Sequence, residues 1–361
     1  MLWPSWLPLR ETLRPLSPYG APQVPAQAAL NTNENPYSPS PVLQKAITDA
    51  VAKVAADLNR YPDRDATILR SQLADYINEL SSTKFSAENV WAANGSNEII
   101  QLIFLAFAQG PVLGFTPSYS MHPLIAKVTG AQWIDGKRNA DFSLNTSDAI
   151  VEIQKNKPTL TFITTPNNPT GGAVTIDEIQ KLADACKAVG GLLVVDEAYA
   201  EFSQEKSAVT LIANHPQVIV IRTMSKAFAF AGARVGYLVS DVAVREAMMI
   251  VRLPYHLSAL TQAAAQVAID HRAELLGGVA TLIAARASVV TALQDLGLTT
   301  IVSSANFVLF TGFKQEAPEL WAELLEKGVL IRDVGLSGYL RVTIGNDAEN
   351  TLFISALKEL I

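Results

Sequence analysis

The sequence predicts an α/β protein built on a mostly parallel β-sheet that helices cover on both faces. Short apolar or β-branched runs alternate with helical stretches between residues 111 and 222, which is typical of βαβ connections. The length of 361 residues exceeds what one hydrophobic core usually fills, so a second, smaller domain is expected. Hydrophobic residues make up 49% of the chain and charged residues 17%, which is the composition of a folded protein.

The predicted elements follow in order along the chain. Residues 1–41 are rich in proline and lack periodicity, so they are expected to form an extended arm. Apolar spacing predicts helices over 42–58 and 66–80, and a third from about 97 to 108. The alternating section that comes next comprises strands at 111–115, 131–134, 159–164, 192–195 and 218–222, and helices at 123–129 and 176–189.

A change of pattern after Pro254 marks the second part of the chain. A long helical stretch, about 259–296, is followed by a few strands and a final helix. The change predicts three sections, which are an N-terminal arm or lid at 1–30, a smaller α/β domain made of 31–55 and 260–361, and a larger domain at 56–259.

Charge and composition argue against several classes of partner. Nucleic acids and membrane surfaces select basic patches, so the net charge of −6 speaks against both, although a few buried arginines would still hold a small anionic substrate. The single cysteine, Cys186, allows no intramolecular disulfide. The N-terminus lacks the pattern of a signal peptide and the apolar runs are broken by Gln or Arg, so a cytoplasmic protein is expected.

Two neighbouring strands are followed by residues that suit catalysis. Asp196 ends the apolar run 192–195, and a buried carboxylate is costly unless it is paired or hydrogen-bonded. A helix-capping role would explain Asp196 alone. Lys226 follows the next strand, where burial and nearby charge would lower its pKa and make it an imine-forming amine. A surface lysine is the ordinary alternative. Ligands bind at the carboxyl ends of strands in open α/β sheets, which favours the catalytic interpretation.

Three further features suit a phosphorylated ligand. Arg234 lies among small residues, and its planar guanidinium matches the spacing of phosphate oxygens. A structural ion pair is the alternative role for this arginine. The turn at 94–96 opens a helix, whose backbone N–H groups bind phosphate or are simply capped. The prolines beside Asn168 would hold its amide rigidly, or merely form a tight turn. No metal-ligand cluster, dinucleotide fingerprint or Walker loop in the sequence competes with this set.

Together these residues resemble the signature of the fold-type I, class I and II aminotransferases. The matching segments are Asn168-Pro169-Thr170-Gly171, Asp196-Glu197-Ala198-Tyr199 and Ser225-Lys226-Ala227-Phe228 with Arg234. Further segments are similar to the histidinol-phosphate aminotransferase family, and these are Asn33-Glu34-Asn35-Pro36-Tyr37, Arg60-Tyr61-Pro62-Asp63, Asn94-Gly95-Ser96-Asn97-Glu98 and Pro117-Ser118-Tyr119-Ser120-Met121. The likeness runs from about residue 9 to the C-terminus. His122, Thr165 and Ala229 depart from the family pattern, which bears on the fine shape of the substrate pocket.

The resemblance implies a seven-stranded sheet and a pyridoxal 5'-phosphate cofactor carried by the catalytic Lys226 as a Schiff base. Asp196 would pair with the pyridine nitrogen, Tyr199 and Asn168 with the ring hydroxylate, and Tyr119 would stack on the ring. Other residues would hold the cofactor phosphate, namely Ser96, Asn97, Thr223, Ser225, Arg234 and, from the partner subunit of a homodimer, Tyr61.

Substrate recognition is expected on the second part of the chain. Alternation on a strand near 340 puts Tyr339, Arg341 and Thr343 on one face, which faces solvent in an ordinary half-exposed strand. By resemblance, Arg341 is instead the anion clamp for a substrate phosphate or carboxylate, and Arg332 assists it. The resemblance also assigns substrate contacts to Asn35 and to Tyr19 of an N-terminal lid.

The implied reaction is amino transfer between L-histidinol phosphate and 2-oxoglutarate or glutamate in histidine biosynthesis, by a cytoplasmic homodimer with shared active sites. No nucleic acid, membrane or metal is expected to take part. An aromatic amino-acid aminotransferase on the same scaffold is the nearest alternative. A phosphothreonine decarboxylase is a second one. A non-catalytic regulator that binds the same cofactor is a third, but it would need a DNA-reading module that the sequence does not offer.

Overall fold

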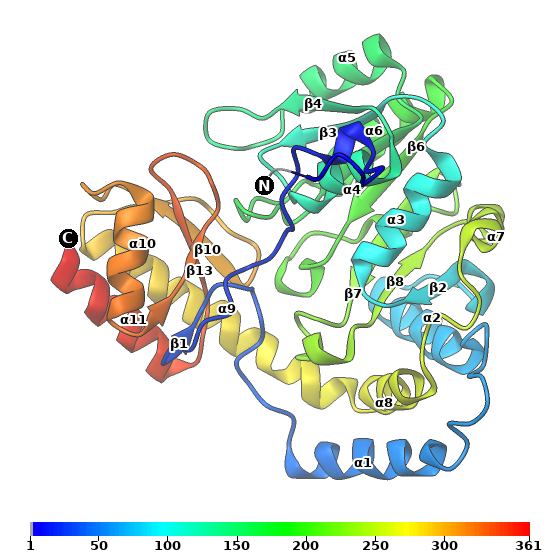
Figure 1. Cartoon of the computed structure of the whole chain (residues 1–361), viewed down its shortest axis with the longest axis horizontal. Helices are drawn as coiled ribbons and strands as arrows, with labels where there is room; N and C mark the ends of the chain where they lie inside the picture. The colour runs from blue at the N-terminus through cyan, green and yellow to red at the C-terminus, as the bar shows by residue number, and fades with distance from the viewer. Residues whose placement is uncertain (1–2) are drawn as a thin grey trace.

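The structure is a computed structural model that describes residues 3–361. Its larger part surrounds a seven-stranded sheet with the order β2-β8-β7-β6-β5-β3-β4 (Figure 1). The strands are β2 (Val90–Ala93), β3 (Val112–Thr116), β4 (Trp133–Lys137), β5 (Leu160–Thr164), β6 (Leu192–Asp196), β7 (Val218–Thr223) and β8 (Gly236–Val239). Only β8 runs antiparallel to its neighbours, so the expected seven-stranded, mostly parallel sheet is confirmed.

Helices cover both faces of this sheet because successive strand residues point to opposite sides. Val195 packs into one core and Val194 into the other. The first core contains residues of α1 (Pro41–Ala55), α2 (Thr67–Ser81), α5 (Thr146–Asn156), α6 (Ile176–Ala188) and α8 (Ala259–Asp270). The second contains residues of α3 (Ser96–Phe107), α4 (Met121–Thr129) and α7 (Val242–Val251). Burial on both faces explains why the inner strands, such as β5 and β6, are mostly apolar, whereas the edge strand β4 carries exposed polar residues.

The smaller part of the chain has a four-stranded antiparallel sheet with the order β12-β13-β10-β9. These strands are β9 (Thr299–Thr300), β10 (Phe307–Thr311), β12 (Arg332–Asp333) and β13 (Leu340–Thr343), and they pack with α9 (Arg272–Asp295), α10 (Ala317–Glu326) and α11 (Asp347–Leu360). Short 3-10 helices lie at η1 (Glu11–Leu13), η2 (Ala87–Asn89), η3 (Ala200–Phe202), η4 (Ala208–Leu211) and η5 (Ala231–Ala233).

The long helical stretch expected after Pro254 is in fact two helices, α8 and α9. The predicted limits placed α1 and α8 in the smaller domain. Their apolar residues, for example Leu43 and Ala265, are instead buried in the core of the large sheet. Within α9, Leu275 belongs to that same core and Val279 to the smaller one. We therefore propose that the two domains divide inside α9 and not near residue 260.

Helix α9 is also the one helix among residues 3–361 that is long and apolar enough to cross a membrane, judged by length and composition. Core helices of soluble proteins meet the same criteria, and α9 contributes residues to both cores.

The N-terminal arm runs across the large domain before it joins the smaller part (Figure 1). The Arg10 guanidinium donates a hydrogen bond to the Val128 carbonyl at the end of α4 (2.5 Å). Further on, β1 (Ala28–Ala29) pairs in parallel with β11 (Val329–Leu330). The arm therefore contacts both parts of the chain. Its first two residues lie outside the described range.

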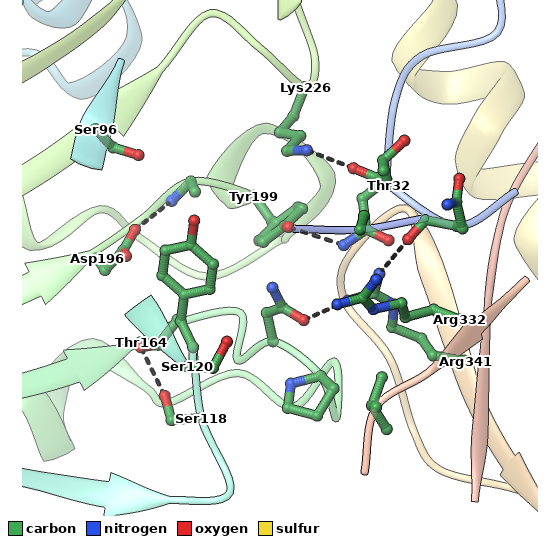
Figure 2. A pocket seen from close by; sticks show the side chains of 18 of the residues that line it. Thr32, Ser96, Ser118, Ser120, Thr164, Asp196, Tyr199, Lys226, Arg332 and Arg341 are labelled. Atoms are coloured by element: carbon green, nitrogen blue, oxygen red, sulfur yellow. Dashed lines mark hydrogen bonds between the residues drawn. The ribbon is translucent and has the colours of Figure 1, made fainter. Parts of the chain in front are cut away.

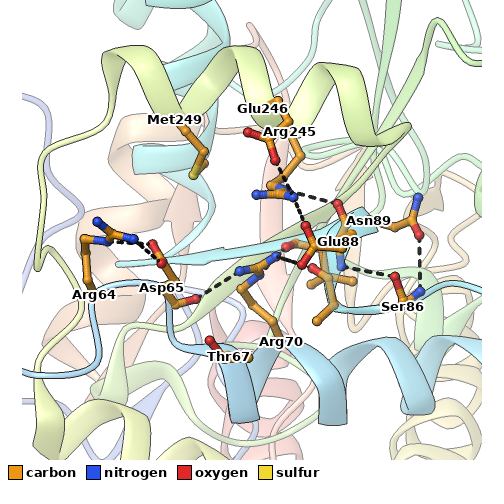
Figure 3. A network of polar contacts seen from close by, with 12 residues as sticks. Arg64, Asp65, Thr67, Arg70, Ser86, Glu88, Asn89, Arg245, Glu246 and Met249 are labelled. Carbon is orange, nitrogen blue, oxygen red and sulfur yellow. Dashed lines mark hydrogen bonds and ion pairs between the residues drawn. The ribbon is translucent and has the colours of Figure 1, made fainter.

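A network of polar side chains fixes the start of α2 against the edge of the large sheet (Figure 3). Arg70 is buried and donates to the backbone carbonyl of β2 (2.7 Å). Arg245 on α7 forms an ion pair with Glu88 of η2. Asp65, just before α2, pairs with Arg252 just after α7 (2.9 Å). These contacts tie α2, η2 and α7 together.

Candidate active site

A cavity of about 480 Å³ opens between the large sheet and the smaller part of the chain (Figure 2). Thr164 and Asp196 reach it from the carboxyl ends of β5 and β6, and Arg332 and Arg341 reach it from β12 and β13. The predicted site residues that line the cavity are Tyr19, Ser96, Tyr119, Asn168, Asp196, Tyr199, Lys226, Arg332 and Arg341. The others, which are not among its lining residues, are Asn35, Tyr61, Asn97, Thr223, Ser225 and Arg234.

Lys226 follows β7 in a turn and extends toward the arm that precedes α1. Its Nζ donates a hydrogen bond to the Thr32 carbonyl (2.8 Å, Figure 2). Burial, together with the positive charge of Arg341, lowers the pKa of Lys226 to about 8. A substantial fraction of Lys226 is therefore a neutral, nucleophilic amine in mildly alkaline solution.

Asp196 is a buried carboxylate at the end of β6, as predicted. Its Oδ1 accepts a hydrogen bond from the Ala198 amide (3.2 Å), and its Oδ2 lies 3.1 Å from His122 Nε2. His122 is itself only 1% exposed. From the sequence, His122 is expected to affect only the fine shape of the substrate pocket; that expectation is wrong, because His122 contacts the predicted cofactor-binding Asp196. The only signal was its position three residues after Tyr119, one turn away at the start of α4.

Tyr199 and Asn168 each have a hydrogen-bond partner at the border of the smaller part of the chain, namely Asn33 and Arg341 respectively. Asn33 Nδ2 donates a hydrogen bond to Tyr199 Oη (2.8 Å). Burial raises the pKa of Tyr199 to about 12, although Arg341 and this hydrogen bond act in the opposite direction. Arg341 Nη1 donates to Asn168 Oδ1 (2.5 Å). The Asn168 amide nitrogen is therefore left as a donor for another partner.

Three segments converge to form an anion cradle, defined as the turn at 94–97, the end of β7 and Arg234. Gly95 has φ +79°, and a Cβ there would lie 2.6 Å from Arg234 Nη2. Thr223 Oγ1 donates to Ser225 Oγ (3.0 Å), which in turn lies 3.5 Å from Arg234 Nη1. Among residues 3–361, no carboxylate forms an ion pair with Arg234. The guanidinium is thus available to an anion at the start of α3.

The Tyr119 ring lies in the cavity beside this cradle. Its Oη donates to Asn97 Oδ1 (3.1 Å), and its ring meets the edge of His122 at a centroid distance of 5.4 Å. Burial raises the pKa of Tyr119 above its usual range. The hydroxyl therefore stays neutral and the ring is held in one orientation.

Two arginines lie on paired strands of the smaller sheet, where β12 and β13 bring Arg332 opposite Arg341. Arg341 is 5% exposed, its Nη2 donates to the Asn31 carbonyl (2.8 Å), and it packs over the Phe307 ring. Burial lowers the pKa of Arg341 to about 10, so it remains charged at neutral pH. In the described part of the chain neither arginine pairs with a carboxylate. The solvent-facing alternative for Arg341 is therefore wrong.

Two predicted residues lie away from the cavity wall. Asn35 Nδ2 donates to the Ala227 carbonyl (3.3 Å), so it supports the turn that carries Lys226. Tyr61 is 79% exposed and stacks on Tyr255 with a centroid distance of 4.4 Å. Its predicted contact with the cofactor of a partner subunit stays a prediction.

A buried ion network supports the loop after β6. Arg222 is 1% exposed and forms ion pairs with Glu197 and Glu201, each at 2.9 Å. Glu197 also accepts a hydrogen bond from the Ala208 amide (2.6 Å). The network holds the segment between Asp196 and η3 in place.

Known proteins share this architecture. A family model described as aminotransferase class I and II matches residues 25–357. The histidinol-phosphate aminotransferase of Mycobacterium sp. (strain JLS) is 52% identical over 359 residues, covering 98% of this chain and 94% of the relative. Two crystal structures of histidinol-phosphate aminotransferases are similar in fold. The one from Clostridium acetobutylicum has a TM-score of 0.83, 23% identity and coverage of 92% of this chain and 98% of its own.

The other structure, from Sinorhizobium meliloti, is in complex with pyridoxal-5'-phosphate. It has a TM-score of 0.81 and 24% identity, and covers 93% of this chain and 91% of its own. The family match spans most of the chain and includes the strand ends that form the cavity. The chain therefore belongs to the class I and II aminotransferase family.

Proposed function

We propose that the chain transfers an amino group between L-histidinol phosphate and 2-oxoglutarate or glutamate, with pyridoxal 5'-phosphate as cofactor, in histidine biosynthesis. The observation that carries this proposal is that one cavity holds Lys226, Asp196 and two arginines without carboxylate partners. Histidinol phosphate and glutamate each bring an anionic group that such arginines bind. The curated relatives at 52% identity are named for the same substrate.

Pyridoxal phosphate fits the groups that are present. The anion cradle suits its phosphate, because a side chain at Gly95 would fill the space that Arg234 faces. Asp196 offers a buried carboxylate to the pyridine nitrogen, and Lys226 offers an amine in the same cavity. When bound, pyridoxal phosphate supplies an electron sink that stabilises negative charge on the substrate Cα.

The proposed roles of the cofactor-binding residues follow from these positions. Asp196 would hold a proton at the ring nitrogen, while Tyr199 and Asn168 would donate hydrogen bonds to the ring oxygen. Tyr119 would pack on the ring face. The phosphate would be held by Ser96, Asn97, Thr223, Ser225 and Arg234.

Lys226 is proposed as the catalytic residue. Its Nζ would hold the cofactor and, as a free amine whose pKa is about 8, take up and release the proton of the substrate Cα. Arg341 and Arg332 would bind the substrate phosphate or carboxylate and so orient the reacting carbon. Tyr19 of the arm lines the same cavity and would exclude water from the bound substrate, with Asn35 supporting the lysine turn.

We further propose a cytoplasmic homodimer with shared active sites. Tyr61 stacks on Tyr255, and the segment that leads to Tyr255 exposes Ile250 (85% exposed) and Leu253 (74% exposed). Exposed apolar groups of this kind mark association surfaces. Burial of this surface in a dimer would bring Tyr61 toward the partner's phosphate cradle. Sedimentation of the wild-type chain and of Ile250→Lys tests this, since a monomeric wild type would overturn it.

Steady-state rates with competing amino donors test the substrate. Histidinol phosphate should give the highest kcat/KM, followed at a distance by phenylalanine, with 2-oxoglutarate as acceptor. A higher kcat/KM with phenylalanine would make the chain an aromatic amino-acid aminotransferase. Release of carbon dioxide from phosphothreonine would instead identify a decarboxylase.

A further inference from the structure

We propose that Asn33, held by Thr343, is a positioning residue that directs the single hydroxyl hydrogen of Tyr199 toward the ring oxygen of bound pyridoxal phosphate. The inference rests on the proposed function, since it concerns how this chain receives its cofactor. Asn33 lies on the segment between the arm and α1, and it is 1% exposed. Its Nδ2 donates to Tyr199 Oη at 2.8 Å, across 166 residues of sequence (the dashed line at Tyr199 in Figure 2).

The orientation of the Asn33 amide follows from its contacts with Thr343. Thr343 Oγ1 accepts a hydrogen bond from the Asn33 backbone amide (3.0 Å) and donates its own hydrogen to Asn33 Oδ1 (3.0 Å). Rotating the amide by half a turn would leave the Thr343 hydroxyl hydrogen without an acceptor. Thr343 is 2% exposed, and a buried unpaired donor is costly. The amide nitrogen therefore faces Tyr199.

The backbone holds Asn33 in place as well. Asn33 has φ +57°, a left-handed conformation that asparagine adopts more readily than most residues. Its carbonyl accepts a hydrogen bond from Asn306 Nδ2 (3.1 Å). Asn33 is thus anchored through its side chain and backbone by Thr343 of β13 and through its carbonyl by the turn before β10.

The fixed position of the Asn33 amide determines the direction in which Tyr199 donates its hydroxyl hydrogen. A phenol has one hydrogen, and Asn33 already occupies one acceptor position on Oη, so the hydrogen points elsewhere. Tyr199 lines the cavity, and none of the hydrogen bonds among the described residues takes this hydrogen. A donor aimed into the cavity suits an anionic oxygen, which is what the ring of pyridoxal phosphate presents. Asn33 thereby acts on the cofactor through Tyr199 without touching it.

Reversing the donor at position 33 tests the proposal. Asn33→Asp keeps the shape and tolerates φ +57°, but a carboxylate accepts and would take the Tyr199 hydrogen for itself. Pyridoxal phosphate binding to the cofactor-free chain, followed by protein fluorescence, should weaken about tenfold or more. The pH midpoint of the bound cofactor's visible absorbance should move upward, because an oxygen that loses a donor retains its proton more strongly.

The same change in a Tyr199→Phe background separates this mechanism from a general structural effect. If Asn33 acts through Tyr199, Asn33→Asp should add little there to either the dissociation constant or the absorbance midpoint. An equal shift in both backgrounds would overturn the proposal. Asn350→Asp is a matched control, since Asn350 is 9% exposed in the smaller domain and does not line the cavity. It should leave both readouts unchanged.

If the buried carboxylate of Asn33→Asp prevents folding, two other substitutions still test the proposal. Asn33→Gly accepts the left-handed backbone and removes only the amide, and Thr343→Val removes the hydroxyl that orients it. Both should shift the absorbance midpoint in the same direction as Asn33→Asp, whereas Thr343→Ser should restore it. Wild-type midpoints in both variants would refute the inference. A wild-type chain that binds no pyridoxal phosphate would instead refute the proposed function.

Discussion

Replacing Arg341 by glutamine should weaken histidinol phosphate strongly while leaving the fold intact. Arg341 is 5% exposed and stays charged at neutral pH. Removing one partner of a buried, hydrogen-bonded charge pair costs about 2–5 kcal/mol. Since 1.4 kcal/mol corresponds to a factor of ten, KM for histidinol phosphate should rise between about 30-fold and several thousand-fold. Glutamine keeps a donor near Asn168 Oδ1, which limits the loss within the protein itself.

The assay is steady-state kinetics for histidinol phosphate at saturating 2-oxoglutarate, and for glutamate separately. Arg341→Lys keeps the charge without the fork and should lie between wild type and Arg341→Gln. Lys155→Gln removes a charge from the 69% exposed side chain on α5 and should change nothing. An unchanged KM for histidinol phosphate in Arg341→Gln would refute the role of Arg341 as the anion partner.

Four further predictions concern the cofactor, the amino transfer and the fold. The rate at which the cofactor-free chain binds pyridoxal phosphate should increase with pH around a midpoint near 8, because burial lowers the pKa of Lys226 and the neutral amine is the form that reacts. Lys226→Ala should abolish amino transfer in the steady-state assay. Gly95→Ala should weaken cofactor binding about tenfold in fluorescence titrations, through strain and contact with Arg234, whereas Gly130→Ala, facing open space, should not. Arg222→Met should destabilise the chain by about 3–5 kcal/mol and lower its thermal midpoint, since two buried carboxylates lose their partner.

The part of the site that depends on local pattern is predictable from the sequence. Asp196 and Lys226 follow apolar runs that form β6 and β7, and neighbouring parallel strands bring their carboxyl ends to one edge. Helices with a strong apolar face, such as α3 and α6, begin and end within a few residues of their expected limits. These features need only periodicity and the direction of the chain.

Contacts between distant segments are not predictable in this way. Strand β8 lies between β2 and β7, and neither its antiparallel direction nor its neighbours follow from its own residues. The hydrogen bond from Asn33 to Tyr199 and the contact of His122 with Asp196 depend on the completed fold. Helix α5 is not predicted because its sequence is mostly polar; the Asn145 cap and the apolar spacing of Ala149 and Ile153 are the signals that would have found it.

Helix α9 connects the two cores, and its sequence contains a weak point between them. Leu275 packs with the large sheet and Val279, one turn later, with the smaller one. Gly277 and Gly278 lie between these residues. Each glycine destabilises a helix interior by about 1 kcal/mol relative to alanine, so α9 bends most easily here. A bend in α9 at these residues would change the width of the cavity that both parts of the chain line, although the glycines themselves do not line it.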